Sequence, residues 1–355
     1  MSPSVLRQSD DLTPTLPASW YSDPEVLRRE QALIFARSWH YVGHAGELPR
    51  AGQFRATLLG RVPVVLVRDD ARVLRAFLNV CRHRGALVCD GTGARATLQC
   101  PYHAWTYGLD GRLLQAPRLA AEGVSETREL GLVELQLQSW GPFLFVNPHR
   151  DAAPLREMLG DVPERIARAG IDVDSLRFLE RSESELAANW KIVVENYLEC
   201  YHCPVAHPGF SRALDVSVDA YWLEANASRM SQGCPPRASA GGEVRAAEFH
   251  LLFPGTFVNV YPGRANLSIG PLWPCAPERT RRFLDYFVAP DADPSWVEEL
   301  QALDEQVGKE DRALVESVHA GLASGLLDSG KLLPESERLI AHFQALVRAA
   351  LASRS

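Results

Sequence analysis

The chain has 355 residues, which is long for one hydrophobic core and predicts two domains. Its 46% hydrophobic and 23% charged residues are typical of a globular protein, and no apolar run approaches the roughly 20 residues of a membrane helix. The formal net charge of −7 argues against a nucleic-acid binder, because such affinity comes from Lys and Arg on phosphates.

The first 20 residues contain no apolar stretch behind a basic start, so they predict a loosely attached lead-in and no secretory signal. The expected location is therefore the cytoplasm, without a membrane. Residues 24–39 have the apolar spacing of an amphipathic helix. We expect residues 1–39 to pack, as a segment and a helix, on the C-terminal domain.

Residues 40–150 predict a small all-β domain. Short β-rich runs between residues 52 and 80 are separated by Gly, Asp and Arg. Leu109-Asp110-Gly111-Arg112 is a strong hairpin signal, and residues 132–147 predict another strand pair.

Residues 151–355 predict an α+β domain. We expect helices over residues 154–169 and 186–203, strands within 218–290, and helix from about Ser295 to the end. An antiparallel sheet with helices packed beside it is the expected arrangement.

The seven cysteines favour reduced thiols, metal ligands or core residues over a disulfide framework. Four of them lie within three residues of a histidine, which directs attention to metals: Cys81, Cys100, Cys200 and Cys203. Cys89 has no such neighbour and is expected to be structural.

The chain contains two Cys–His pairs, Cys81-x-His83 and Cys100-x-x-His103, and sixteen residues separate His83 from Cys100. Arg84 and Gly85 follow the first pair. In a Rieske [2Fe–2S] cluster, two thiolates hold one iron and two imidazoles hold the other. A structural zinc site is the alternative, since two Cys and two His also suit tetrahedral zinc. The single residue within the first pair, and the alternation of Cys and His, weigh against zinc.

His202 and His207 lie five residues apart, a spacing that does not share one face of a continuous helix. Pro204 and Pro208 predict that the helix ends near Cys203, which lets His207 turn back. Glu199 is expected on the helical face of His202. An isolated pair of this kind is more often structural, but an upstream electron donor favours an Fe(II) site with two His and one carboxylate.

Asp311 is the best candidate for that carboxylate. It shares an expected helical face with Val307, Leu314 and Val318, and an ionised carboxylate turned inward is costly unless it is paired or binds a metal. Asp304 is the second candidate, and Glu310 is expected to face solvent.

These motifs resemble Rieske non-haem iron oxygenase α-subunits over nearly all of residues 17–355. The similar segments are NVCRHRG, CPYHAWTY, ENYLECYHCPVAH and KEDRALVESV, with Ala104 where many members have Gly. The resemblance implies a Rieske domain and a helix-grip (START-like) catalytic domain. It implies Cys81, His83, Cys100 and His103 as cluster ligands, and His202, His207 and Asp311 as iron ligands. Glu199 would be the acidic bridge for electrons, with Asn196 as a further catalytic candidate.

The expected function is that of a terminal oxygenase, which uses O2 at a mononuclear Fe(II) to hydroxylate a small molecule, with N-demethylation as one form. Electrons would come from NAD(P)H through a separate reductase or ferredoxin, and the family implies a homotrimer. The ECYHC segment is more typical of members that act on quaternary amines and other small molecules. A ring-dihydroxylating dioxygenase and a Rieske electron carrier without oxygen chemistry are the alternatives.

Pocket walls are expected from the strands of residues 218–290, although aromatic residues at strand spacing are more often ordinary core. The candidates are Phe249, Phe253, Phe257, Tyr261 and Trp273.

Overall fold

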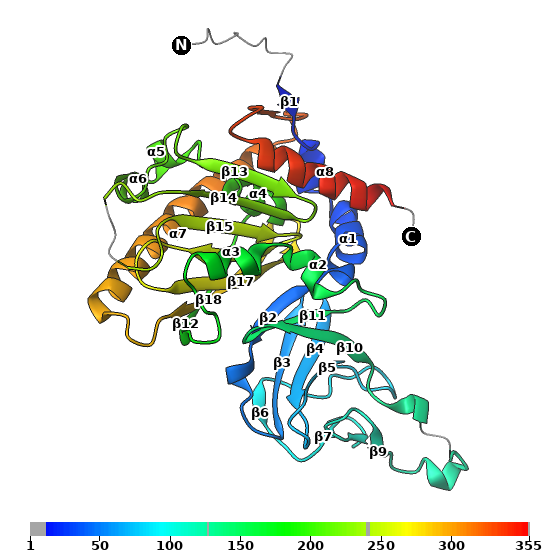
Figure 1. Cartoon of the computed structure of the whole chain (residues 1–355). Helices are drawn as coiled ribbons and strands as arrows, with labels where there is room; N and C mark the ends of the chain where they lie inside the picture. The colour runs from blue at the N-terminus through cyan, green and yellow to red at the C-terminus, as the bar shows by residue number, and fades with distance from the viewer. Residues whose placement is uncertain (1–11, 126–127, 239–241, 354–355) are drawn as a thin grey trace. The chain divides into compact units, whose positions relative to one another are not determined.

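The computed structural model describes residues 12–125, 128–238 and 242–353, which form two compact units (Figure 1). The small unit comprises Phe35–Leu155, and the large unit comprises Met1–Ile34 with Arg156–Ser355. The chain therefore begins in the large unit, builds the small unit, and returns. Among the described residues, no helix is long and apolar enough to cross a membrane.

The small unit is all-β apart from short 3-10 turns, as its sequence predicted. A seven-stranded antiparallel sheet has the order β2 (His40–His44), β11 (Phe143–Asn147), β10 (Glu134–Trp140), β5 (Leu74–Leu78), β4 (Val62–Arg68), β3 (Gln53–Leu59) and β6 (Thr92–Ala94). A second sheet contains β7 (Leu98–Gln99), β8 (Thr106–Tyr107) and β9 (Leu113–Gln115). The 3-10 turns are η3 (Phe35–Arg37), η4 (Ala45–Glu47), η5 (Ala120–Glu122) and η6 (Arg128–Leu130).

The predicted hairpin at residues 109–112 joins β8 to β9. Gly111 has φ +84°, and a Cβ at this position would lie 2.5 Å from the ring of Phe77. Only glycine fits this turn, because the backbone is left-handed and packs directly on the core. The turn thereby fixes the strand that follows the second Cys–His pair.

The large unit contains a second seven-stranded antiparallel sheet. Its order is β12 (Arg177–Leu186), β18 (Arg279–Val288), β17 (Asn266–Ala276), β16 (Thr256–Val260), β15 (Ala247–Leu252), β14 (Arg229–Cys234) and β13 (Trp222–Asn226). The strands within residues 218–290 are confirmed. Strand β12 was missed because its charged and serine-rich sequence has low strand propensity, which an edge strand tolerates.

Helices accompany this sheet in the α+β arrangement that the sequence predicted (Figure 1). They are η2 (Ala18–Tyr21), α1 (Pro24–Leu33), α2 (Leu155–Leu159), α3 (Val162–Arg168), α4 (Trp190–Tyr197), α5 (Cys203–Ala206), α6 (Pro208–Ala213), α7 (Pro294–Leu322) and α8 (Arg338–Ala352). Helices α4 and α7 contact each other and the sheet. Helix α4 carries Asn196, and α7 carries Asp311.

Several expected helices are shorter than predicted. Helix α1 ends at Leu33, and the helix expected over residues 154–169 is interrupted at Gly160, whose φ is +56°. The C-terminal helix is two helices, with strand β19 (Lys331–Leu332) between them. Strand β1 (Thr13–Pro14) pairs with β19, and Leu16 is fully buried, so the lead-in is docked where it is described. Residues 1–11 of that expected lead-in lie outside the described residues.

A buried polar network holds α4 in place. Lys191 Nζ donates to Glu30 Oε1 over 2.7 Å, and both side chains are fully buried. Glu195 Oε1 accepts from Tyr21 O–H over 2.8 Å and from Gln344 Nε2 over 2.9 Å. Because buried charges are tolerated only when they are paired and hydrogen-bonded, this network joins α1, α4, α8 and η2 in one orientation.

Candidate metal centres and active site

The two Cys–His loops of the small unit adopt the same turn. Cys81 N–H donates to Ala86 O over 2.8 Å, and Cys100 N–H donates to Trp105 O over 2.8 Å. The fourth residue after each cysteine is left-handed, with φ +76° at Gly85 and +55° at Ala104. The equivalent hydrogen bonds give the two loops the same backbone turn, and each turn carries one thiol and one imidazole.

The four candidate cluster ligands separate into buried sulfur and exposed nitrogen. Cys81 and Cys100 are buried, free thiols. His83 and His103 are exposed, and their ring centroids lie 4.7 Å apart. His83 stacks on Trp105 at 5.1 Å, which fixes its ring.

Tyr107 contacts the sulfur of Cys81. Its hydroxyl lies 3.2 Å from Cys81 Sγ and accepts from Arg82 N–H over 3.0 Å, which leaves the hydroxyl hydrogen free for the sulfur. Hydrogen bonds to sulfur tune the potential of an iron–sulfur cluster.

The spacing of these ligands fits two irons better than one zinc. The ligands of a tetrahedral zinc lie about 4 Å or less from one another. Within the part of the chain that is described, no three of these four residues bring donor atoms within 4.8 Å of one another. Cys89 is buried among core residues, and burial raises the pKa of its thiol to about 11, which suits the structural role expected for it.

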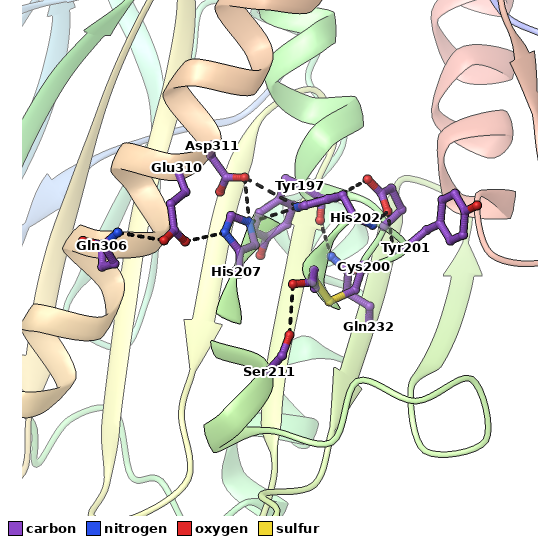
Figure 2. A network of polar contacts seen from close by, with 12 residues as sticks. Tyr197, Cys200, Tyr201, His202, His207, Ser211, Gln232, Gln306, Glu310 and Asp311 are labelled. Atoms are coloured by element: carbon purple, nitrogen blue, oxygen red, sulfur yellow. Dashed lines mark hydrogen bonds and ion pairs between the residues drawn. A yellow bond between two sulfur atoms is a disulfide. The ribbon is translucent and has the colours of Figure 1, made fainter. Parts of the chain in front are cut away.

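The second group of ligands forms around α5. Helix α4 ends at Tyr197, so the expected continuation to Cys203 is wrong. His202 and His207 instead flank the single turn of α5, with their Nε2 atoms 3.1 Å apart. Asp311 Oδ1, from α7, lies 3.0 Å from His207 Nε2 and 3.6 Å from His202 Nε2 (Figure 2).

The chemistry of these donor atoms fits a metal ion. His202 Nδ1 contacts the carboxylate of Glu199, and His207 Nδ1 lies 2.7 Å from Glu310 Oε2. Because ionised carboxylates only accept hydrogen bonds, each Nδ1 donates, and each neutral Nε2 carries a lone pair. Two lone pairs and Asp311 Oδ1 therefore face one another. Adjacent ligands of an octahedral metal lie about 3 Å apart, which matches this triangle.

The electrostatics of the group also favour positive charge. Burial lowers the pKa of His202, but its contacts with Asp311 and Glu199 outweigh burial and raise that pKa to about 9. Burial would raise the pKa of Asp311, but the two imidazoles hold it well below its usual range. The three side chains therefore favour positive charge between them, either as protons on the imidazoles or as a bound metal cation.

Three expectations about the surrounding acids are corrected. Glu310 is only partly exposed, and its carboxylate is held by two partners: Oε2 accepts from His207, and Oε1 accepts from Gln306 Nε2 over 2.7 Å (Figure 2). Asp304 is not at the triangle, since it accepts from the hydroxyls of Tyr261 and Tyr286. Glu199 does not lie on a helix. It reaches His202 through the turn after α4, where its carboxylate also accepts from the backbone N–H of His202 over 3.2 Å.

Two further expectations about this region are wrong. Val318 is 48% exposed, so the face of α7 that carries Asp311 is not turned inward along its whole length. Cys200 and Cys203 form a disulfide, because the turn before α5 brings their Cα atoms to 4.9 Å. His202 therefore lies inside a four-residue disulfide loop.

A cavity of about 100 Å³ adjoins the three metal-binding candidates. Asn196 lines it from the last turn of α4. Aromatic side chains dominate its walls: Tyr197, Phe210, Tyr221, Phe249 and Tyr261. Burial raises the pKa of the three tyrosines well above its usual value, so they remain neutral phenols.

Only two of the five expected wall residues, Phe249 and Tyr261, line this cavity. Phe253 stacks near Phe343, Phe257 near Tyr197, and Trp273 near Phe283. Tyr197 and Phe210 were missed although they flank the histidine motif, and Tyr221 carries no sequence signal of its own.

The chain matches known families over both units. Residues 38–138 match the Rieske [2Fe-2S] domain, and residues 173–353 match the catalytic domain of the ring hydroxylating alpha subunit. The carnitine monooxygenase oxygenase subunit of Acinetobacter pittii is 33% identical, over 97% of each chain. The chloroplastic choline monooxygenase of Amaranthus tricolor is 32% identical, over 94% of this chain and 76% of the relative.

Solved structures agree with these matches. The quaternary ammonium Rieske monooxygenase CntA in complex with L-carnitine superposes with a TM-score of 0.84 at 32% identity, covering 96% of this chain and 97% of that one. Naphthalene 1,2-dioxygenase from Rhodococcus superposes with a TM-score of 0.82 over 98% of this chain and 96% of that one, but at 20% identity it shows the fold alone.

The protein is thus a non-haem iron oxidoreductase that uses a Rieske [2Fe–2S] cluster, a mononuclear iron and O2. It takes electrons from a partner and acts on a small molecule. The carnitine and choline relatives above are monooxygenases, which favours mono-oxygenation over ring dihydroxylation. The chain belongs to the family of Rieske-type ring-hydroxylating oxygenase α subunits.

Proposed function

We propose that this oxygenase mono-oxygenates a small molecule that carries a quaternary ammonium group. The supporting observation is the cavity beside His202, His207 and Asp311, whose walls include five aromatic rings. Aromatic faces attract a cation that has no N–H to donate, and each such contact contributes about 0.5–2 kcal/mol. The relatives named for carnitine and choline act on cations of this class.

We assign Cys81, His83, Cys100 and His103 to the cluster. We assign His202, His207 and Asp311 to the iron, which when bound supplies the site where O2 is activated. The chain's own contribution is to hold these donors. Glu199 and Glu310 each keep the proton of one imidazole on Nδ1, so that both Nε2 lone pairs face the metal position.

We assign Asn196 a role in orienting the substrate. It lies on the wall of the cavity, where its amide can orient a bound substrate by hydrogen bonding. The aromatic walls exclude water from the reacting group. One substrate, one O2, two electrons from NAD(P)H and two protons then give one oxygenated product and one water.

We propose that the electrons reach the iron through Glu199, from the cluster of a neighbouring copy in a homotrimer. His83 and His103 are exposed in the small unit. Tyr201, in the turn that carries His202, and Val205, in α5, are 65% and 89% exposed, which suits coverage by another copy. A separate NAD(P)H-dependent reductase or ferredoxin would reduce the cluster.

The electron route is tested with Glu199→Ala. Because Glu199 also orients His202, the variant is first loaded with Fe(II) to the wild-type iron content. Its reduced cluster should then be reoxidised by air and substrate much more slowly than the wild-type cluster. Equal reoxidation rates would contradict the route through Glu199.

The function is tested by O2 uptake with a reductase, NADH and a panel of L-carnitine, γ-butyrobetaine, choline and aromatic acids. We expect uptake matched by loss of an ammonium compound, and none with Asp311→Ala or without the reductase. Turnover of aromatic acids alone would overturn the proposal.

A further inference from the structure

Arg282 is the one Lys or Arg residue that lines the active-site cavity within the described chain. It lies on β18, where Arg282, Leu284 and Tyr286 alternate toward α7. The Arg282 guanidinium does not contribute to the group of His202, His207 and Asp311 that could hold a metal. Its surroundings show whether it is committed to a structural partner.

The acids of the cavity are all engaged elsewhere. Glu199 contacts His202, Asp311 contacts both imidazoles, and Asp304 accepts from two tyrosine hydroxyls. Arg282 Nε donates to Ser184 Oγ over 3.1 Å. Among the described residues, no carboxylate lies within 4.0 Å of its guanidinium, so its two terminal nitrogens have no anionic partner.

The guanidinium lies beside the helix that carries Asp311. A Cβ placed on Gly308 would be 3.7 Å from Arg282 Nη2. Gly308 precedes Asp311 by three residues, which is about 4.5 Å along the helix axis. Arg282 is therefore about one helical turn from the metal-binding position.

A larger polar cavity of about 280 Å³ shares four lining residues with the active-site cavity: Arg282, Leu284, Asp304 and Gly308. The other cations of the larger cavity are paired, Lys309 with Glu305 at 2.7 Å and Arg312 with Glu316 at 3.4 Å. Among the described residues that line the two cavities, Arg282 is therefore the cation available to bind an anionic group of a ligand.

We propose that Arg282 binds a carboxylate of the substrate. The inference rests on the proposed function: the aromatic walls take the ammonium end, the guanidinium takes the other end, and the substrate is a betaine. A planar guanidinium binds a carboxylate through two parallel N–H donors, which adds geometric specificity to charge attraction. Choline, a cation whose other end is an uncharged hydroxyl, leaves the Arg282 guanidinium without an anionic partner.

The test compares γ-butyrobetaine with its methyl ester, which keeps the ammonium group and removes the negative charge. For the wild-type holoenzyme with its reductase, kcat/KM should be at least tenfold higher for the acid. Arg282→Gln should lower kcat/KM for the acid 10- to 100-fold, mainly through KM, and change that for the ester less than threefold, because a charge-assisted hydrogen-bond pair contributes about this much. Arg282→Lys should recover part of the loss.

Arg281→Gln is the matched control. Arg281 precedes Arg282 on β18, is exposed, and pairs with Glu185 at 2.7 Å on the other side of the strand. Its substitution removes the same charge and should leave both substrates unaffected. Equal losses for acid and ester in Arg282→Gln, or a wild-type enzyme indifferent to the ester, would overturn the proposal.

Failure of the proposed function remains distinguishable. If no ammonium compound is consumed, that function fails, and binding of butyrate is measured by calorimetry instead. Binding to the wild-type protein that Arg282→Gln abolishes supports the carboxylate site. No binding, or binding that the substitution leaves unchanged, refutes it.

Discussion

Glu310 is expected to set the iron affinity of this oxygenase without touching the iron. Its Oε2 accepts from His207 Nδ1 over 2.7 Å, and Gln306 holds its other oxygen at the same distance. Loss of a carboxylate that orients a ligating imidazole typically costs 10- to 100-fold in metal affinity, which is about 1.4–2.7 kcal/mol. Glu310→Ala should approach the upper value. Glu310→Gln keeps an acceptor but removes the charge, and should fall near the lower value.

The assay measures iron that remains after dialysis against chelators of graded strength. The visible spectrum of the Rieske cluster serves as an internal control in the same sample. Glu299→Gln, at an exposed position of α7, is the matched charge control. If Glu310→Ala retained iron as the wild type does, or lost the cluster as well, the reasoning would be wrong.

Three further predictions concern Tyr107, Ala104 and Glu195. Tyr107→Phe removes the hydroxyl next to Cys81 Sγ and should make the cluster potential more negative in a redox titration followed by EPR; an unchanged potential counts against that hydrogen bond. Ala104 has a left-handed backbone that is unfavourable for alanine, so Ala104→Gly should stabilise the protein by about 1 kcal/mol. Ala313→Gly, at an exposed position of α7, should destabilise it by about as much. The midpoints of thermal unfolding should therefore move in opposite directions. Burial raises the pKa of Glu195 from 4.5 to about 7, so the protonated form is favoured in the folded state. Its contribution is complete below pH 4.5 and is lost as pH rises through 7, a decrease of up to about 3 kcal/mol in the free energy of unfolding. Glu195→Gln should flatten this part of a urea-unfolding series between pH 5 and 8, and an unaltered slope would refute it.

The sequence predicted features that depend on local chemistry. The Cys–His spacings place thiols and imidazoles on turns, and the hairpin at Gly111 follows from a backbone that only glycine adopts there. Runs such as FHLLFPGTFVNVY and RRFLDYFVAP predicted the strands within residues 218–290. These signals need no knowledge of distant neighbours.

Features that depend on tertiary contacts could not be predicted in this way. Glu310 appeared to be a surface residue of α7, and only the turn at α5 brings His207 to it. Strand β12 is recognisable only from its pairing with β18, because its own residues favour solvent. Arg282 belongs to no sequence motif. It stands out only in the folded chain, where the acids of the cavity are bound to other residues.

The central claim is that this chain couples Rieske electron transfer to mono-oxygenation of a betaine. The most direct measurement follows the holoenzyme, its reductase and γ-butyrobetaine in one vessel, recording NADH, O2 and substrate together. We expect one NADH and one O2 to disappear for each substrate molecule lost, and Asp311→Ala to abolish all three losses. NADH oxidation with O2 consumption but no loss of the betaine, or activity that survives Asp311→Ala, would contradict it.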